Sequence, residues 1–135
     1  MSPNTEPLTI VRRAYDCFSK HDIPGILQLI GADCDWRAPG PTPAMPWAGT
    51  YRGPDEVRKF FDKLDMNLEF LEFSPLDYLV EGDKVMVRGH ERDRSKMTGK
   101  EFEVDWAHYF VVKDGKIVRF EDFQDTASIQ AALLH

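Results

Sequence analysis

The chain has 135 residues, of which 42% are hydrophobic and 30% are charged, and its formal net charge is −6. This composition is typical of a soluble globular protein, and the length is that of one ordinary domain with a core of its own. The acidic balance, without a cluster of lysine and arginine, argues against nucleic acid or an anionic membrane as partner. We therefore expect one domain over residues 1–135.

The N-terminus and the cysteines bear on the cellular compartment. The first residues, MSPNTEPLT, have neither the basic nor the apolar region of a signal peptide. No apolar run approaches the roughly 20 residues that a membrane span needs. Cys17 and Cys34 lie in apolar or strand-like settings, which favours reduced core thiols over a disulfide. These features predict a cytoplasmic protein.

Apolar residues at helical spacing mark the first half of the chain. The first amphipathic stripe spans Leu8–Phe18. A second helix is predicted after Asp22, a good N-cap, and its apolar face extends to Ile30 and ends at Gly31. A third is predicted over Gly53–Leu64, with acids near its positive N-terminal end.

Between and after these helices the pattern is different. Residues 34–38 (CDWRA) predict a short strand, and the proline- and glycine-rich residues 39–53 predict an irregular loop. From Asn67 onward the residues predict strands, with a short closing helix in TASIQAALL. The predicted strands are LEFLEF and DYLV, separated at Ser74-Pro75, then VMVRGHERDR, the run ending at Val112, and the run after a DG turn. This order predicts an α+β fold, with helices packed across one face of a bent, mainly antiparallel sheet that encloses a cone-shaped pocket.

The last hairpin, VDWAHYFVVKDGKIVRFEDFQDT, sets one histidine against two neighbouring acids. Alternate strand residues point to opposite faces, so His108 shares a face with only one of Glu121 and Asp122. A two-residue loop, Asp114-Gly115, would set His108 opposite Glu121. A three-residue loop, with Gly115 as a left-handed bulge, would put Asp122 diagonal to it on the same face.

The composition of the faces favours the three-residue loop. That register points Asp105, Arg119 and Glu121 away from the face that carries His108, and a buried face should hold few charges. We therefore predict a glycine bulge and a pair formed by His108 and Asp122 in an apolar cavity. The face so predicted consists of Trp106, His108, Phe110, Val112, Val118, Phe120, Asp122 and Gln124.

Three stretches resemble the nuclear-transport-factor-2-like superfamily, in its SnoaL-like or ketosteroid-isomerase-like branch. They are VRRAYDCFSKHDIPGILQLIGADCDW, YRGPDEVRKFF and DWAHYFVVKDGKIVRFEDFQDT, and the resemblance covers nearly the whole chain. It implies a conical cavity lined by helices on a curved sheet, and a homodimer formed through that sheet. The superfamily includes isomerases, dehydratases, cyclases, epoxide hydrolases and non-catalytic domains, so the resemblance does not specify the reaction.

Site residues of two such relatives match this chain in part. The general base of ketosteroid isomerase falls on Ala38 and its oxyanion-hole tyrosine on Ala14, beside Tyr15, which argues against steroid isomerisation by that set. Its oxyanion-hole aspartate falls on His108. The catalytic aspartate on the last strand of limonene-epoxide hydrolase corresponds to Asp122.

The strand at residues 85–94 offers further groups. The arginine and aspartate of the epoxide hydrolase map there, with Arg92 at the arginine and Arg94 in place of the acid; the hydrolase's water-binding tyrosine corresponds to Trp36. If the face with His90 and Arg92 lines the cone, Arg92 can bind a carboxylate or enolate and His90 can relay a proton. If it is the outer face, both are solvated or contact a second subunit. Strand parity alone leaves both alternatives open.

Acid/base chemistry is the predicted activity. A carboxylate can fix the tautomer of an imidazole in an apolar cavity, and the scattered histidines, without HxH, HExxH or CxxC, predict neither a metal nor a cofactor. We expect isomerisation, dehydration or cyclisation of a small, mostly apolar, oxygen-bearing molecule. The alternatives are a non-catalytic ligand-binding or dimerising module and an epoxide-hydrolase-like enzyme. The predicted catalytic residues are Asp122, His108, His90 and Arg92, and the predicted substrate-binding residues are Tyr15, Trp36, Trp47, Trp106, Phe110 and Phe120.

Overall fold

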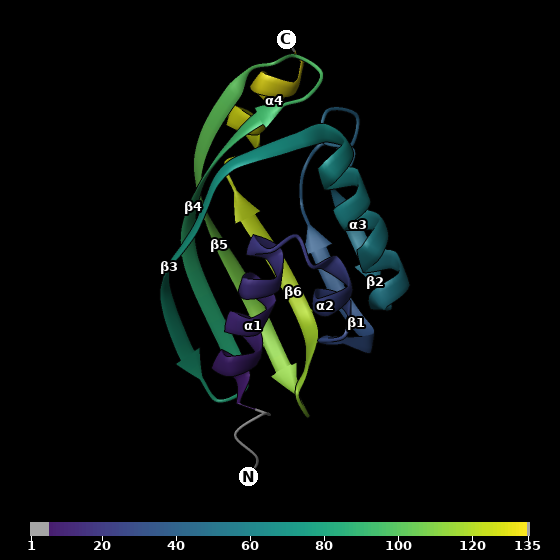
Figure 1. The fold of residues 1–135 in the computed structure, drawn as a ribbon, viewed down its shortest axis with the longest axis vertical. Helices are drawn as coiled ribbons and strands as arrows, with labels where there is room; N and C mark the ends of the chain where they lie inside the picture. The colour runs from purple at the N-terminus through teal and green to yellow at the C-terminus, as the bar shows by residue number, and fades with distance from the viewer. Residues whose placement is uncertain (1–5, 135) are drawn as a thin grey trace.

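The computed structural model describes residues 6–134 and, within them, four helices packed on one six-stranded sheet (Figure 1). The helices are α1 (Pro7–Ser19), α2 (Ile23–Leu27), α3 (Gly53–Asn67) and α4 (Thr126–Leu134), and the strands are β1 (Ile30–Ala38), β2 (Gly49–Arg52), β3 (Leu68–Glu81), β4 (Lys84–Ser95), β5 (Glu101–Lys113) and β6 (Lys116–Gln124). The strand order is β2-β1-β6-β5-β4-β3, and within residues 6–134 only the β1–β6 pair is parallel. This confirms the α+β fold with helices on a curved, mostly antiparallel open sheet.

The helices cover one face of the sheet and one of its ends (Figure 1). Figure 1 shows α1, α2 and α3 in front of one face of the sheet, and α4 at the end where the chain terminates. Helix α1 buries Ile10, Val11 and Ala14, and α3 buries Val57 together with two phenylalanines. Because one face of the sheet is covered and the other is not, inward and outward positions of each strand differ sharply in burial.

Two elements of the first half differ from the sequence prediction. Helix α2 ends at Leu27, and Ile30 and Gly31 already belong to β1. The N–H of Ile117 donates to the carbonyl of Leu29 over 2.8 Å, so pairing with β6 draws this segment out of the helix. Local periodicity extended the helix too far because it does not include that partner strand.

The proline-rich segment and β3 also differ from the prediction. Residues 49–52, expected in an irregular loop, form β2 and pair with the C-terminal half of β1. The break expected at Ser74-Pro75 is absent from the described chain, since β3 runs continuously with register irregularities on either side of Pro75. A proline is tolerated there because β3 is the edge strand, whose outer N–H groups have no ladder partner.

The last hairpin contains the most informative correction. The turn has two residues, Asp114 (φ 52°) and Gly115 (φ 75°), the signature of a type I′ turn, and Lys113 pairs with Lys116. The predicted three-residue loop with a bulge at Gly115 is therefore wrong. A bulge does occur, but within β6, where Val118 lies between residues paired with Val112 and Val111.

That bulge restores the face that the composition predicts. Val112 pairs with Ile117, which is fully buried in place of the predicted Val118, and His108 then lies directly opposite Asp122. Glu121 points to the other face, where it forms an ion pair with Arg119. The predicted pairing of His108 with Asp122 is thus correct in its residues, although the turn that produces it is different.

The thiols and the hydropathy of the helices complete the description. Cys17 and Cys34 are both free, and burial raises the pKa of the Cys34 thiol to about 12. Between residues 6 and 134, no helix is both long and apolar enough to cross a membrane. Residues 1–5, part of the segment judged to lack a signal peptide, lie outside the described residues.

Candidate active site

A cavity lies between the inner face of the sheet and the helices. Its volume is about 80 Å³, where a single water needs about 10–15 Å³ on the same measure, so the cavity suits a small organic molecule. Most of its lining is aromatic or aliphatic. The polar side chains that line it are Tyr15, Glu91, Asp93, His108, Asp122 and Gln124.

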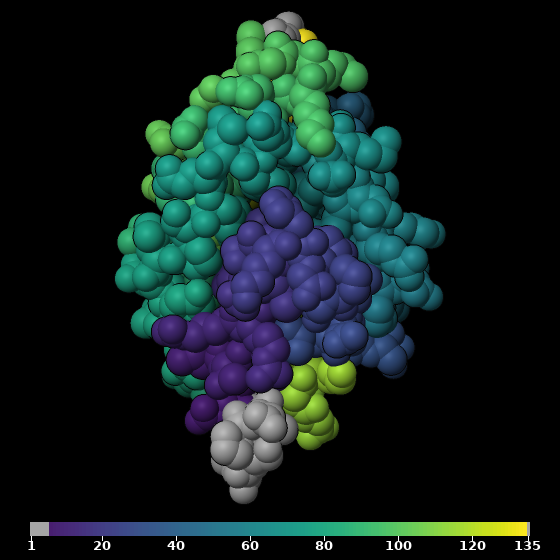
Figure 2. Space-filling model, in the orientation of Figure 1, coloured from purple at the N-terminus to yellow at the C-terminus, as the bar shows by residue number. Residues whose placement is uncertain are grey.

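An open groove adjoins this cavity. It runs between α1, α3 and β3, and Figure 2 shows the surface hollowed where the turn after α1 meets the teal segments of α3 and β3. Tyr15, Phe18 and Phe73 belong to the walls of both the groove and the cavity. The groove and the cavity are therefore neighbouring hollows with common walls.

Three elements bring a tyrosine, a histidine and an aspartate together in the cavity. The Tyr15 hydroxyl from α1 lies 2.7 Å from Nδ1 of His108 on β5, and Nε2 of His108 lies 3.1 Å from Oδ1 of Asp122 on β6. His108 is only 6% exposed and stacks on Trp106 with ring centroids 4.0 Å apart. The ring N–H is not aligned with Oδ1, which has no hydrogen-bond partner among the described residues. His108 and Asp122 therefore lie within ion-pair distance, and Oδ1 of Asp122 can still accept a hydrogen bond.

The environment of this set assigns its protons. Burial first, and then the charges of Tyr78 and Asp122, raise the pKa of Tyr15 far above its ordinary value. The phenol therefore stays neutral. A carboxylate beside Nε2 favours the tautomer with its proton on that nitrogen, which leaves Nδ1 free to accept the Tyr15 O–H. In this arrangement Tyr15 donates its proton toward His108, and His108 points its own N–H side toward Asp122.

Strand β4 adds two acids that sequence analysis missed. Glu91 is 3% exposed and Asp93 is 0% exposed, and both line the cavity. Nε2 of Gln124 donates to Oε1 of Glu91 over 2.8 Å. A signal for this orientation was present, because Val85 and Val87 are apolar and strand alternation carries their face on to Glu91 and Asp93.

These two acids cannot both be ionised at low cost. Burial, followed by the hydrogen bond and charge of Asp93, raises the pKa of Glu91 well above its ordinary value. Burial raises the pKa of Asp93 to about 6, against the lowering effect of a hydrogen bond from Glu91. No other donor reaches either oxygen of Asp93 within the described chain. Near neutral pH the pair therefore holds one proton, which resides mainly on Glu91.

We expect Asp93→Asn to stabilise the protein at pH 7. The pKa of Asp93 is about 6 in the folded protein against an ordinary value of 3.8, so the folded state binds the extra proton between those pH values. The unfolding free energy of the wild type should fall as the pH rises through this window and stay low above it. Removing the charge should restore about 2 kcal/mol at pH 7.

Urea unfolding at pH 4.5 and pH 7 measures this effect. In Asp93→Asn the difference between the two pH values should shrink, whereas Asp62→Asn, on the exposed face of α3, should keep the wild-type difference. A variant that is less stable than the wild type at pH 7 would show that ionised Asp93 stabilises the fold instead.

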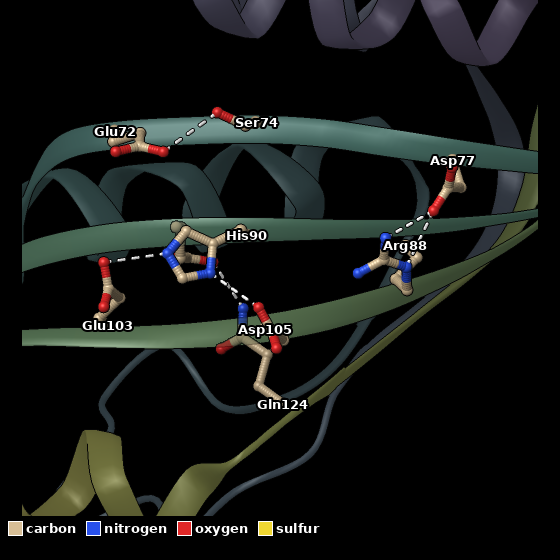
Figure 3. Close-up of polar contacts among 9 residues, drawn as sticks. Glu72, Ser74, Asp77, Arg88, His90, Glu103, Asp105 and Gln124 are labelled. Carbon is tan, nitrogen blue, oxygen red and sulfur yellow. Dashed lines mark hydrogen bonds and ion pairs between the residues drawn. The ribbon is translucent and has the colours of Figure 1, made fainter.

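His90 and Arg92 lie on the outer face of the sheet, so the alternative that placed them in the cavity is wrong. Nδ1 of His90 lies 2.7 Å from Asp105, and Nε2 lies 3.1 Å from Glu103, as Figure 3 shows. Arg92 donates to Glu101 over 3.0 Å. Strand alternation is the physical reason, because the inner positions of β4 belong to Glu91 and Asp93. Because Arg92 lies on the outer face, it cannot take the place of the epoxide hydrolase's arginine in the cavity.

The predicted aromatic wall is largely present. The cavity is lined by Tyr15, Trp36, Trp47, Phe110 and Phe120. Trp106 is not in the lining, which corrects its predicted contact with substrate. Its ring lies against His108 and packs at 4.9 Å on the ring of Phe73. Trp106 therefore packs against the imidazole of His108 and does not contact a ligand in the cavity.

Comparisons with known proteins agree on one family. The SnoaL-like domain model matches residues 11–120. An NTF2-like protein from Burkholderia thailandensis is 31% identical over 96% of this chain and 98% of that one, with a TM-score of 0.87. An NTF2-like protein of unknown function from Burkholderia pseudomallei is 27% identical over 100% of both chains, with a TM-score of 0.88. TerC co-crystallised with polyporic acid is 26% identical over 99% of this chain and 100% of that one, with a TM-score of 0.85. No curated protein matches the chain.

Proposed function

Because the chain belongs to the SnoaL-like family, we propose that it is an enzyme that moves protons on a small, mostly apolar, oxygen-bearing molecule without a cofactor. The observation that carries this proposal is the set of Tyr15, His108 and Asp122, joined by a hydrogen bond of 2.7 Å and an ion-pair contact of 3.1 Å, inside a mainly aromatic cavity. A base of this kind can serve isomerisation, dehydration or cyclisation, and the superfamily that the sequence resembles includes enzymes of those classes.

Tyr15 and His108 can together act as a base that takes a proton from the substrate and passes a proton on to the imidazole. A proton that leaves the substrate reaches the Tyr15 oxygen while the Tyr15 proton passes to Nδ1 of His108. The raised pKa of Tyr15 disfavours a phenolate, so the tyrosine transmits the proton and does not keep its own negative charge. Asp122, 3.1 Å from Nε2, stabilises the imidazolium that results.

A non-catalytic binding module is the second candidate. Ala38 and Ala14, where the ketosteroid isomerases carry their base and tyrosine, favour it. The co-crystallisation of TerC with polyporic acid supports a small ligand in this fold under either candidate. Epoxide hydrolysis has less support, since Arg92 faces outward. The expected homodimer, through the outer face of the sheet with its ion pairs (Figure 3), and the cytoplasmic location also remain proposals.

Deuterium exchange into simple ketones tests the proposed function without knowledge of the natural substrate. Cyclohexanone, β-tetralone and isophorone expose acidic C–H bonds next to a carbonyl, so a base in the cavity should exchange at least one of them. His108→Gln should slow the exchange by about 10²- to 10⁴-fold. His90→Gln, which changes a histidine on the outer face, should leave the exchange at the wild-type rate.

Two outcomes would contradict the enzyme proposal. Wild-type exchange in His108→Gln would remove the histidine from the chemistry. Ketones that raise the melting temperature of the wild type without any exchange would favour the binding module.

A further inference from the structure

The cavity contains a second polar group that the proposed base does not use. Glu91 and Asp93 follow one another on the inner face of β4, whereas His108 and Asp122 lie on β5 and β6. Gln124 connects the two groups, because it donates to Glu91 from the same strand and face as Asp122. The cavity therefore presents a base and an acid pair on different strands.

The acid pair has an unusual environment. Apart from the acid proton of Glu91, no donor of the described residues reaches the buried oxygens of Asp93. No lysine or arginine of the described chain lines the cavity, so no cation compensates the pair. Burying carboxyl groups in this way costs stability unless a ligand or a proton satisfies them. Both residues line the cavity, so a ligand bound there can form hydrogen bonds with their oxygens and their proton.

The surrounding elements offer few other titratable groups. Strands β5 and β6 contribute His108 and Asp122, and α1 contributes Tyr15. Helices α2, α3 and α4 and strand β3 contribute only apolar side chains to the lining. The charge of Asp122 acts on Glu91 in the same direction as the charge of Asp93 and keeps the proton on the pair.

We propose that Glu91 is the acid of the reaction and donates the proton that it shares with Asp93 to an oxygen of the substrate. This inference rests on the proposed function. In the step, the C–H bond of the substrate breaks and its proton passes through Tyr15 to His108. The Glu91 O–H bond breaks and an O–H bond forms on the substrate, which becomes an enol. The positive charge gained by His108 balances the second negative charge that the pair gains when Glu91 loses its proton.

The geometry also defines the substrate class. The ligand must carry a carbonyl oxygen that reaches β4 and an acidic C–H bond that reaches Tyr15, on a carbon skeleton that fits an aromatic cavity. Anionic ligands such as carboxylates are excluded, because three carboxyl groups line the cavity and no basic side chain faces them. Asp93 is a positioning residue, since its role is to keep the proton on Glu91.

Glu91→Gln is the decisive variant. The amide keeps an acceptor for Gln124 and a donor for Asp93 but has no transferable proton. We expect exchange into the same three ketones to slow by about 10²-fold. The matched control is Glu103→Gln, which changes an exposed glutamate beside His90 on the outer face and should exchange at the wild-type rate.

Infrared spectroscopy tests the shared proton directly. The wild type and Glu103→Gln should show the carbonyl band of a protonated carboxylic acid at pH 7, and Glu91→Gln should lack it. Absence of the band from the wild type would overturn the inference, and so would wild-type exchange in Glu91→Gln.

The two proposals fail in different ways. Loss of exchange in His108→Gln together with full exchange in Glu91→Gln would leave the base in place and remove the acid. Absence of exchange in the wild type for every ketone would overturn the proposed function and the catalytic role of Glu91 together, even if the infrared band were present.

Discussion

Asp122→Asn should lower the rate of ketone exchange by about 10²- to 10⁴-fold, while Glu121→Gln, one residue earlier, should leave it unchanged. Asp122 lies 3.1 Å from Nε2 of His108, where its negative charge stabilises an imidazolium and selects the tautomer that accepts from Tyr15. An asparagine has nearly the same shape but carries no charge. Its NH₂ group can also impose the wrong tautomer on His108.

Asp122 and Glu121 are neighbours on β6 but point to opposite faces of the sheet, so comparing their variants separates an effect in the cavity from an effect on the outer face. Glu121 forms its ion pair with Arg119 outside the cavity, so its replacement tests for general effects of removing a carboxylate from this strand. Near-ultraviolet circular dichroism should show an intact fold in both variants. Equal losses of activity in the two variants would exclude a specific role for Asp122.

Gly89→Ala should be among the most destabilising single substitutions in the protein. A Cβ atom at this position would lie 2.1 Å from Cζ2 of Trp106 and within 2.5 Å of two further ring atoms. Gly89 pairs directly with Trp106 across β4 and β5, and the indole lies over its bare backbone. Trp106 cannot shift freely, because its ring packs against both His108 and Phe73. We expect a loss of 3 kcal/mol or slightly more, at the upper end of the roughly 1–3 kcal/mol of overpacking.

A double-mutant cycle identifies the cause of this loss. Trp106→Leu removes the ring atoms, so Gly89→Ala should cost much less in that background, and the coupling measured by urea unfolding should be favourable. Gly40→Ala serves as a control, since its added methyl would meet the flexible end of Met45 and needs only a small adjustment. A Gly89→Ala protein with wild-type stability would contradict the stacking geometry. Because Trp106 supports His108, Gly89→Ala should also slow exchange.

Much of the site follows from local patterns. The helical stripe at Leu8–Phe18 puts Tyr15 on the buried side of α1, and two-residue alternation in β5 and β6 separates charged from apolar positions. Burial of charge is costly enough that the register with His108 beside Asp122 is favoured whatever the turn. The sequence was therefore sufficient for the α+β fold and for the pairing of these two residues.

The turn itself depended on the tertiary structure. Asp114-Gly115 suits a two-residue or a three-residue loop, and a bulge at Gly115 or at Val118 places His108 and Asp122 on the same face. The structure places the extra residue at Val118, beside the point where the register between β1 and β6 is irregular. A bulge is decided by strands on both sides, so the hairpin alone could not locate it.

The orientation of β4 shows the same division between sequence and structure. Alternation determined that His90 and Arg92 share one face and Glu91 and Asp93 the other. Which face is buried depends on where the helices pack, and that is a property of contacts between segments far apart in the chain. Only the tertiary structure placed the two acids inside the cavity, set Gly89 under Trp106, and left His90 among the outer ion pairs. The apolar Val85 and Val87 indicate which face of β4 is buried, but the segments that cover this face around Glu91 and Asp93 come from distant parts of the chain.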